Sequence, residues 1–410
     1  MEIRKISLLG HKDHGKSTLI GKILILTNSI PETRIQEAMK AADELGVEFE
    51  PAYLLDTFVD ERSEGMTFDN TRAQLLYKGV GFELIDVPGH EELIKSMLSG
   101  ASISRFSLVV VSAKEDEGIT TQTRRHIYVS RLLGISKFIV AVNKMDLSNF
   151  NYNVFNSIKE DLTTFFRSIG ISDDLFTIIP ISAFTGENII KKSQNMPWYH
   201  GSTLLEELKM KTILPADSYN DAARIFLQSS MKLDGNRIAL LGEVLSGHFT
   251  SSENLMVFPG GNYLAVSQFM RGNKLVKEVR KGDGVALITK TSRLNEVRGL
   301  VVVNDKFSIR VSEKLELRLF FLDKPSEKLT LYLNNVGTRV QDLNIQNVVD
   351  PTTGYIIGRH DIEPLDTAEI KVTLSNAVAC DVFERCMELG RVVLSSKSKI
   401  IAAGIITSIN

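Results

Sequence analysis

The sequence predicts an α/β domain with a doubly wound, mostly parallel sheet, followed by two all-β barrel domains. In the first half, near-continuous apolar runs alternate with helical stretches, as parallel strands covered on both faces do. Around Leu214-Pro215 the pattern changes to short strand-like runs separated by turn signals, which favours barrels. A second break near Asn304-Asp305 divides this half, so we expect domains at 1–215, 216–305 and 306–410.

The expected elements of the first domain follow from apolar runs and helical periodicity. The expected strands are Ile3–Leu9, Phe82–Asp86, Phe106–Ser112, Lys137–Val142 and Phe176–Ile181. The expected helices are Lys16–Leu26, Glu91–Ser99, Thr121–Leu133, Val154–Ser168 and Thr203–Met210. In the second half, the expected strands include Arg224–Leu227, Ile238–Leu245, Asn254–Phe258 and Gly284–Ile288.

Composition excludes several classes of protein. The 410 residues are 43% hydrophobic and carry a formal charge of −2, so neither a disordered chain nor bulk electrostatic binding of nucleic acid is indicated. Cys380 and Cys386 make neither a disulfide framework nor a thiolate metal site, and we expect plain thiols. The amino terminus lacks the features of a signal peptide and no long apolar run occurs, so we expect a cytoplasmic protein with no membrane partner.

The first motif that carries chemistry runs from Gly10 to Ser17 and matches G-x-x-x-x-G-K-[ST] between an expected strand and an expected helix. Its backbone N–H groups and the helix N-terminus predict a cradle for phosphate oxygens. Within it, Lys16 is predicted to reach the β- and γ-phosphates and the Ser17 hydroxyl to bind Mg²⁺. The nucleotide-binding candidates of this segment are Gly10, His11, Lys12, Asp13, His14, Gly15, Lys16, Ser17 and Thr18.

Two further segments predict how a γ-phosphate would be sensed and attacked. Asp86, at the end of an expected strand, is a candidate for holding Mg²⁺ through water, and Gly89 offers an N–H group to the γ-phosphate. His90 stands where an attacking water would be oriented. Thr67, in a charged segment between the phosphate loop and Asp86, is our candidate for Mg²⁺ coordination and γ-phosphate sensing, the alternative being a solvated loop.

The third motif, Asn143-Lys144-Met145-Asp146, predicts selectivity for guanine. The Asp146 carboxylate would accept from the ring N–H and the exocyclic amine, and a site of this kind discriminates by about 10⁴-fold or more. Asn143 is expected to brace the phosphate loop, while the stem of Lys144 covers the base. Ser182-Ala183 would complete the base pocket through backbone N–H groups.

Together these motifs resemble a translation-factor-type GTPase of the elongation factor Tu and elongation factor 1-alpha superfamily. The resemblance implies a P-loop GTPase domain followed by two barrels, with GTP and Mg²⁺ as ligands. It implies in-line attack of water on the γ-phosphate, with Lys16, Thr67 and His90 as catalytic residues. Ser17, Thr67 and Asp86 would be the metal-binding residues.

A finer resemblance is to the GTP-binding subunit of two-component sulfate adenylyltransferase. It rests on Gly118–His126, which contains Arg124-Arg125-His126, on Val142–Asn149 and on Gly390–Leu394. It implies a transferase complex of sulfate assimilation, in which GTP hydrolysis drives adenylyl sulfate synthesis by a partner, the catalytic ATP sulfurylase subunit. The assembly would be a heterodimer or larger.

The alternative is an elongation factor 1-alpha-like GTPase that delivers aminoacyl-tRNA to the ribosome. Met196–Tyr199 and Gly404-Ile405-Ile406 suit this reading equally well. The basic group that it would use could also be a solvated hairpin; this group is Arg271, Lys274, Lys277, Arg280 and Lys281.

Two positions depart from the superfamily pattern. Lys12 and Met66 stand where Val and Ile are usual in these GTPases. In relatives these two apolar residues flank the catalytic histidine and hold it away until activation. We expect Lys12 to loosen this gate around His90 or to lend positive charge near the γ-phosphate, the alternative being a lysine that points into solvent.

Overall fold

The computed structural model divides into two compact units, Met1–Leu214 with Asp350–Tyr355, and Pro215–Val349 with Ile356–Asn410. It describes residues 3–44, 46–54, 72–86, 104–114, 117–212, 222–233, 237–251, 253–289, 297–326, 328–333, 336–397 and 399–410. Each unit has its own sheets and buried clusters.

The first unit contains a six-stranded sheet in the order β2-β3-β1-β4-β5-β6. Every neighbouring pair is parallel except β2 and β3, which are antiparallel. Because β1 lies between β3 and β4, the loop that follows β1 opens where the strand order reverses, which is where α/β sheets bind ligands. The strands are β1 (Ile3–Leu9), β2 (Arg72–Tyr77), β3 (Val80–Asp86), β4 (Phe106–Ser112), β5 (Lys137–Asn143) and β6 (Phe176–Pro180).

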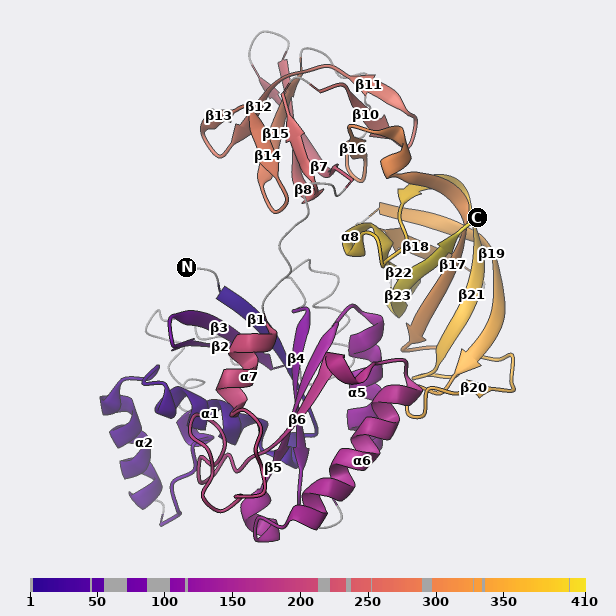
Figure 1. Cartoon of the computed structure of the whole chain (residues 1–410). Coiled ribbons are helices and arrows are strands. Elements are labelled where there is room, and N and C mark those ends of the chain that lie inside the picture. The colour runs from indigo at the N-terminus through magenta and orange to yellow at the C-terminus, as the bar shows by residue number, and fades with distance from the viewer. Residues whose placement is uncertain are drawn as a thin grey trace. The chain divides into compact units, whose positions relative to one another are not determined.

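Helices cover both faces of this sheet, with α1, α2 and α7 on one side and α5 and α6 on the other (Figure 1). The side chains of Phe166 in α6 and Phe176 in β6 stack with ring centroids 4.5 Å apart, which fixes α6 against the sheet edge. The helices are α1 (Lys16–Leu26), α2 (Glu32–Glu44), α5 (Thr121–Leu132), α6 (Tyr152–Ser168) and α7 (Leu204–Lys211), and the 3₁₀ turns are η1 (Lys12–His14), η2 (Met145–Ser148) and η3 (Asp173–Leu175).

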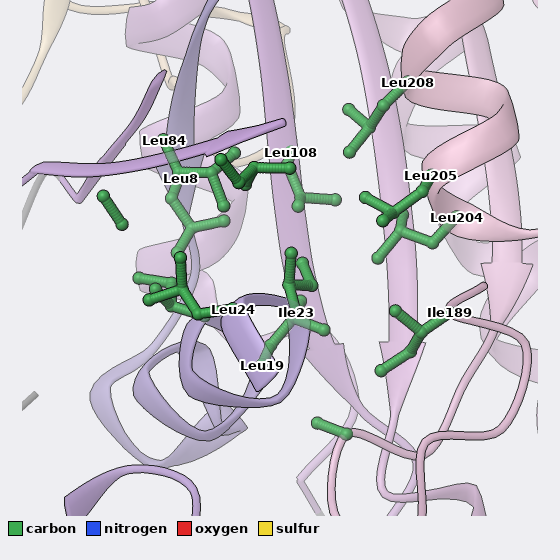
Figure 2. Close-up of a cluster of buried hydrophobic side chains, with 14 of the residues drawn as sticks. Leu8, Leu19, Ile23, Leu24, Leu84, Leu108, Ile189, Leu204, Leu205 and Leu208 are labelled. Carbon is green, nitrogen blue, oxygen red and sulfur yellow. The ribbon is translucent and has the colours of Figure 1, made fainter. Parts of the chain in front are cut away.

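The core beneath α1 holds the phosphate loop in place. Figure 2 shows leucine and isoleucine side chains from α1, α7 and three strands in one buried cluster. Burial of such side chains stabilises by about 1.5–3 kcal/mol each, so the first turn of α1 is anchored against β1. The labelled residues are Leu8, Leu19, Ile23, Leu24, Leu84, Leu108, Ile189, Leu204, Leu205 and Leu208.

The second unit is all-β apart from one short helix and one 3₁₀ turn in its described part. An eight-stranded sheet has the order β11-β10-β16-β7-β8-β15-β12-β13, with a separate β14-β9 pair. A seven-stranded sheet, β18-β22-β23-β17-β21-β19-β20, closes on itself because β18 also pairs with β19.

The strands of the eight-stranded sheet and of the pair are β7 (Arg224–Leu233), β8 (Arg237–Ser246), β9 (His248–Thr250), β10 (Leu255–Phe258), β11 (Asn262–Leu264), β12 (Val266–Arg271), β13 (Lys274–Val276), β14 (Glu278–Arg280), β15 (Gly284–Thr289) and β16 (Val301–Val303). The remaining elements are η4 (Lys306–Ser308), β17 (Arg310–Phe321), β18 (Leu329–Leu333), β19 (Val336–Val349), β20 (Ile356–Ile357), β21 (Thr367–Cys380), α8 (Met387–Gly390), β22 (Arg391–Ser396) and β23 (Lys399–Ile409).

The predicted fold class is confirmed, a mostly parallel α/β domain followed by barrels. The sequence analysis missed α2 and β2, and its helix Glu91–Ser99 lies outside the described residues. Cys380 and Cys386 are buried free thiols, and burial raises the pKa of Cys386 to about 11. In the described part of the chain, no helix is long and apolar enough to cross a membrane. The three-domain boundaries remain a proposal.

Candidate functional site

The loop between β1 and α1 takes a path that requires glycine at both of its ends. Gly10 has φ +138° and Gly15 has φ +83°. A Cβ atom at Gly10 would lie 2.4 Å from the carbonyl oxygen of Val110, and one at Gly15 would lie 2.6 Å from Nδ2 of Asn143. The main chain is therefore free of side chains at these points, as a close backbone approach to phosphate requires.

Lys16 opens α1 and turns its ammonium group back over this loop. The residue is buried, and its Nζ donates to the carbonyl oxygens of Gly10 at 2.9 Å and His11 at 3.3 Å. A buried ammonium group that donates to neutral carbonyl oxygens can exchange them for phosphate oxygens, which bind it more strongly.

His14 is held neutral at the back of the same loop. Its side chain is 1% exposed, and Nδ1 donates to the carbonyl oxygen of Val110 over 3.1 Å. Burial lowers the pKa of His14 below its usual range. By contrast, His11 is partly exposed, and its Nδ1 accepts from the N–H of Asp13 at 3.4 Å.

The low pKa of His14 predicts acid-sensitive stability. Because the pKa of His14 is lower in the folded chain, the unfolded chain binds a proton at this imidazole more readily below about pH 6.5, so stability is lost as the pH falls. The slope approaches about 1.4 kcal/mol per pH unit for one proton. We expect the urea midpoint, followed through the fluorescence of Trp198, to fall less between pH 7 and 5.5 in His14→Gln than in the wild type. Equal falls in the two proteins, or a matching change in the exposed control His200→Gln, would contradict this assignment.

Asn143, the last residue of β5, connects two loops. Its Nδ2 donates to the carbonyl oxygen of His14 at 2.9 Å, and its Oδ1 accepts from the N–H of Ala183 at 2.8 Å. The side chain is 2% exposed, so both hydrogen bonds are shielded from water. The structure thus places the phosphate loop and the Ser182-Ala183 loop around one amide.

The Asp146 side chain offers a hydrogen-bond acceptor to a ligand. Its Oδ1 atom is buried and accepts no hydrogen bond from the part of the chain that the structure describes. Such an atom is costly unless a ligand supplies the donor. The ring N–H and exocyclic amine of guanine are donors of this kind, so the observed carboxylate fits a guanine base.

The Ser182-Ala183 segment braces this region through its backbone. The N–H of Ser182 donates to the carbonyl oxygen of Glu187 at 3.3 Å, and that of Ala183 donates to Asn143. A base contact through Ala183, as predicted from the sequence, would therefore have to share a donor that is already engaged.

The predicted metal-binding residues are only partly described. Ser17 is exposed in the first turn of α1, and Asp86 ends β3 in register with Leu8 of β1. Both positions lie near the carboxyl ends of β1 and β3, next to the phosphate loop. Hydroxyl and carboxylate oxygens are ligands that suit Mg²⁺. Thr67, Gly89 and His90 lie outside the described residues, as does Met66.

The remaining loop residues face outward. Lys12 and Asp13 are exposed, and Thr18 is partly exposed. The exposure of Lys12 agrees with the solvent-facing alternative in the sequence analysis.

The sequence analysis did not single out Glu117, which contacts the guanine motif. Its Oε2 accepts from Nζ of Lys144 at 3.1 Å, and its Oε1 lies 3.2 Å from Nζ of Lys114. The signal was weak because Glu117 belongs to an acidic run, Glu115-Asp116-Glu117, of the type that solvated loops contain. Its distance in sequence from Asn143–Asp146 concealed the contact.

Two family models match this chain. The model described as "Elongation factor Tu GTP binding domain" matches residues 1–228, which is more than half of the chain. The model described as "GTP-eEF1A C-terminal domain-like" matches residues 316–407.

Known proteins match along nearly the whole length. Elongation factor 1-alpha of Aeropyrum pernix is 30% identical and covers 98% of this chain and 95% of its own. The same factor from Thermoplasma acidophilum is 30% identical, covering 97% and 95%, respectively. A solved structure of sup35 complexed with GDP covers 100% of this chain and 94% of its own, with 22% identity and a TM-score of 0.44.

Proposed function

The chain belongs to the translation-factor GTPases, the family that shares the elongation factor Tu GTP-binding domain, and from this membership we propose that it acts as an elongation factor 1-alpha-type factor. As a GTPase of this family, it binds GTP with Mg²⁺ and hydrolyses it. In our proposal it carries aminoacyl-tRNA to the ribosome and hydrolyses GTP there.

The site residues divide the work of hydrolysis. Lys16 and the N–H groups that follow Gly15 would hold the β- and γ-phosphates, while Ser17, Thr67 and Asp86 would hold the metal ion. Magnesium bound there would neutralise charge on the phosphate oxygens. Water attacks the γ-phosphorus as the bond to the bridging oxygen breaks, and His90 is our proposed group for orienting that water.

The proposal that the site selects guanine rests on the buried acceptor Oδ1 of Asp146. The variant Asp146→Asn tests this proposal. In the variant, the amide N–H₂ opposes the exocyclic amine of guanine and instead donates to the carbonyl of xanthine. We expect the wild type to bind GTP at least about 10³-fold more tightly than XTP, and the variant to reverse this preference. Equilibrium titration with GTP, XTP and ATP measures both ratios.

The control for this experiment is Asp173→Asn, which removes an exposed carboxylate that pairs with Arg167 in the same unit. This variant should keep the wild-type order of affinities. Binding of ATP as tight as that of GTP to the unmodified protein would contradict the guanine site itself.

The full-length similarity supports the elongation-factor proposal over sulfate activation, which the sequence analysis had favoured. The group of basic residues between Arg271 and Lys281 gives the binding of aminoacyl-tRNA little electrostatic support. Arg271 pairs with Asp283 at 3.2 Å and Arg280 with Glu278 at 2.9 Å, so two of its five charges are compensated locally.

Sulfate activation remains a second candidate function because of the segment Arg124–His126 in α5. Arg124 is engaged within the protein, since it donates to Asp161 at 2.6 Å and lies over the ring of Phe165. Arg125 stands where the sequence resembles the sulfate adenylyltransferase subunit. Its Nε is buried and has no hydrogen-bond partner among the described residues. This candidate needs a catalytic partner subunit to form adenylyl sulfate.

Two assays on one protein preparation separate these functions. The GTP-loaded protein is tested for protection of aminoacyl-tRNA from deacylation, with the GDP-loaded protein as control. Native lysate pull-downs are then assayed for adenylyl sulfate formation that GTP stimulates. Protection of charged tRNA supports the first proposal, whereas GTP-stimulated adenylyl sulfate formation without protection would replace it by the second.

A further inference from the structure

A carboxylate beside the guanine motif joins two lysines from different loops. Glu117 follows β4 and precedes α5, and it contacts Nζ of both Lys144 and Lys114. Lys114 Nζ lies 3.2 Å from Oε1, while Lys144 Nζ lies 3.1 Å from Oε2. Each oxygen of the carboxylate thus holds one ammonium group, and the negative charge keeps two like charges close together.

This pair differs from the surface ion pairs of the same unit. The side chains of Lys144 and Glu117 are 22% and 24% exposed, whereas those of Arg167 and Asp173 are 62% and 57% exposed. Partial burial opposes the charged form of Glu117, yet hydrogen bonds from Ser112, Lys144 and Lys114 lower its pKa to about 2. The Glu117 carboxylate is therefore ionised at neutral pH.

Lys144 also has an unusual backbone conformation, next to the residues of the guanine motif. Lys144 has φ +62°, a left-handed conformation that is uncommon for residues other than glycine, and it immediately precedes Met145 and Asp146. The charges of Glu117 and Lys144 also reach His14 of the phosphate loop. By holding Lys144, Glu117 therefore acts between the guanine motif and the phosphate loop.

We propose that Glu117 is a positioning residue of the nucleotide site, which holds Lys144 in the orientation that covers the base and thereby slows nucleotide release. The inference rests on the guanine site proposed above. In this proposal Lys144 is the residue that covers the base, and Glu117 acts through its contact with Nζ of Lys144. Without the carboxylate, Lys144 and Lys114 repel each other, and the lysine stem leaves the base.

The test is the dissociation rate of fluorescent GDP and GTP analogues, chased with excess unlabelled nucleotide, from the full chain. Glu117→Gln keeps the size of the side chain and removes its charge. We expect release to become about tenfold faster for both nucleotides, because one charge-assisted contact is lost. The control Asp173→Asn, which breaks an exposed ion pair, should stay within about twofold of the wild type.

A double-mutant cycle distinguishes positioning through Lys144 from general damage to the fold. If Glu117 acts through Lys144, then Glu117→Gln adds nothing further in a Lys144→Met background. Equal acceleration in both backgrounds, or a rate within twofold of wild type for Glu117→Gln, overturns the inference. Failure of the wild type to bind either nucleotide would instead overturn the guanine site and this inference with it.

Discussion

Replacing Gly15 by alanine is expected to lower the affinity for GTP and GDP by about 100-fold or more. The residue has φ +83°, and its added Cβ would lie 2.6 Å from Nδ2 of Asn143, closer than real Cβ contacts come. The loop must move away from that amide, which breaks the hydrogen bond from Asn143 to His14 and misaligns the N–H groups at the start of α1. Equilibrium titration with fluorescent GDP measures the loss.

Gly170→Ala is the matched control. Gly170 has φ +74°, but an added Cβ there would meet nothing within 4 Å. It therefore carries the backbone strain without the contact with Asn143, and we expect nucleotide affinity within about twofold of the wild type. If both variants bind equally well, the bracing of the phosphate loop by Asn143 does not matter for binding. Fluorescence of Trp198, the only tryptophan in the sequence, verifies that the first unit is folded.

The strands that are buried on both faces of the sheet could be predicted from the sequence. β4 is buried along its whole length, and such strands appear in the sequence as unbroken apolar runs. β2 was missed because it is an antiparallel edge strand with a half-buried pattern in which Leu76 faces outward. α2 was missed because only Ala38 and Ala42 of its residues are buried, so its apolar stripe is narrow.

The parts of the site that lie within one short segment were predicted, and a contact between separate loops was not. Local motifs such as Gly10–Ser17 and Asn143–Asp146 carry their own spacing, so the sequence alone reveals them. The link from Glu117 to Lys144 joins residues on separate loops, and no local spacing encodes it. The finer choice within the family depended on Arg124–His126, a segment of α5 in which Arg124 donates a hydrogen bond to Asp161 of α6 and Arg125 has a buried Nε.

The ion pair between Arg224 and Asp381 predicts the largest effect on stability in the second unit. Nη2 of Arg224 lies 2.5 Å from Oδ2 of Asp381, and the two side chains are 3% and 2% exposed. Nε of Arg224 also donates to the carbonyl oxygen of Ser308 at 2.8 Å. Arg224 begins β7 of the eight-stranded sheet, whereas Asp381 follows β21 of the seven-stranded sheet, so the pair ties these sheets together.

Arg224→Met is expected to destabilise this unit by about 3–5 kcal/mol, because it leaves the Asp381 carboxylate buried without its partner. Arg385 cannot compensate fully, since its Nη1 lies 3.7 Å from Oδ1 and its side chain is 50% exposed. The double variant Arg224→Met, Asp381→Leu removes both charges and should recover most of the loss. Urea unfolding followed by circular dichroism measures the change.

Two further results decide whether burial of the charge causes this effect. Arg280→Met breaks an exposed ion pair with Glu278 in the same unit and should leave the transition unchanged. If the uncompensated carboxylate causes the destabilisation, then the double variant Arg224→Met, Asp381→Leu is more stable than Arg224→Met alone. A penalty that persists in the double variant would instead indicate lost packing around the guanidinium group, and the ion pair would then have little part in holding the two sheets together.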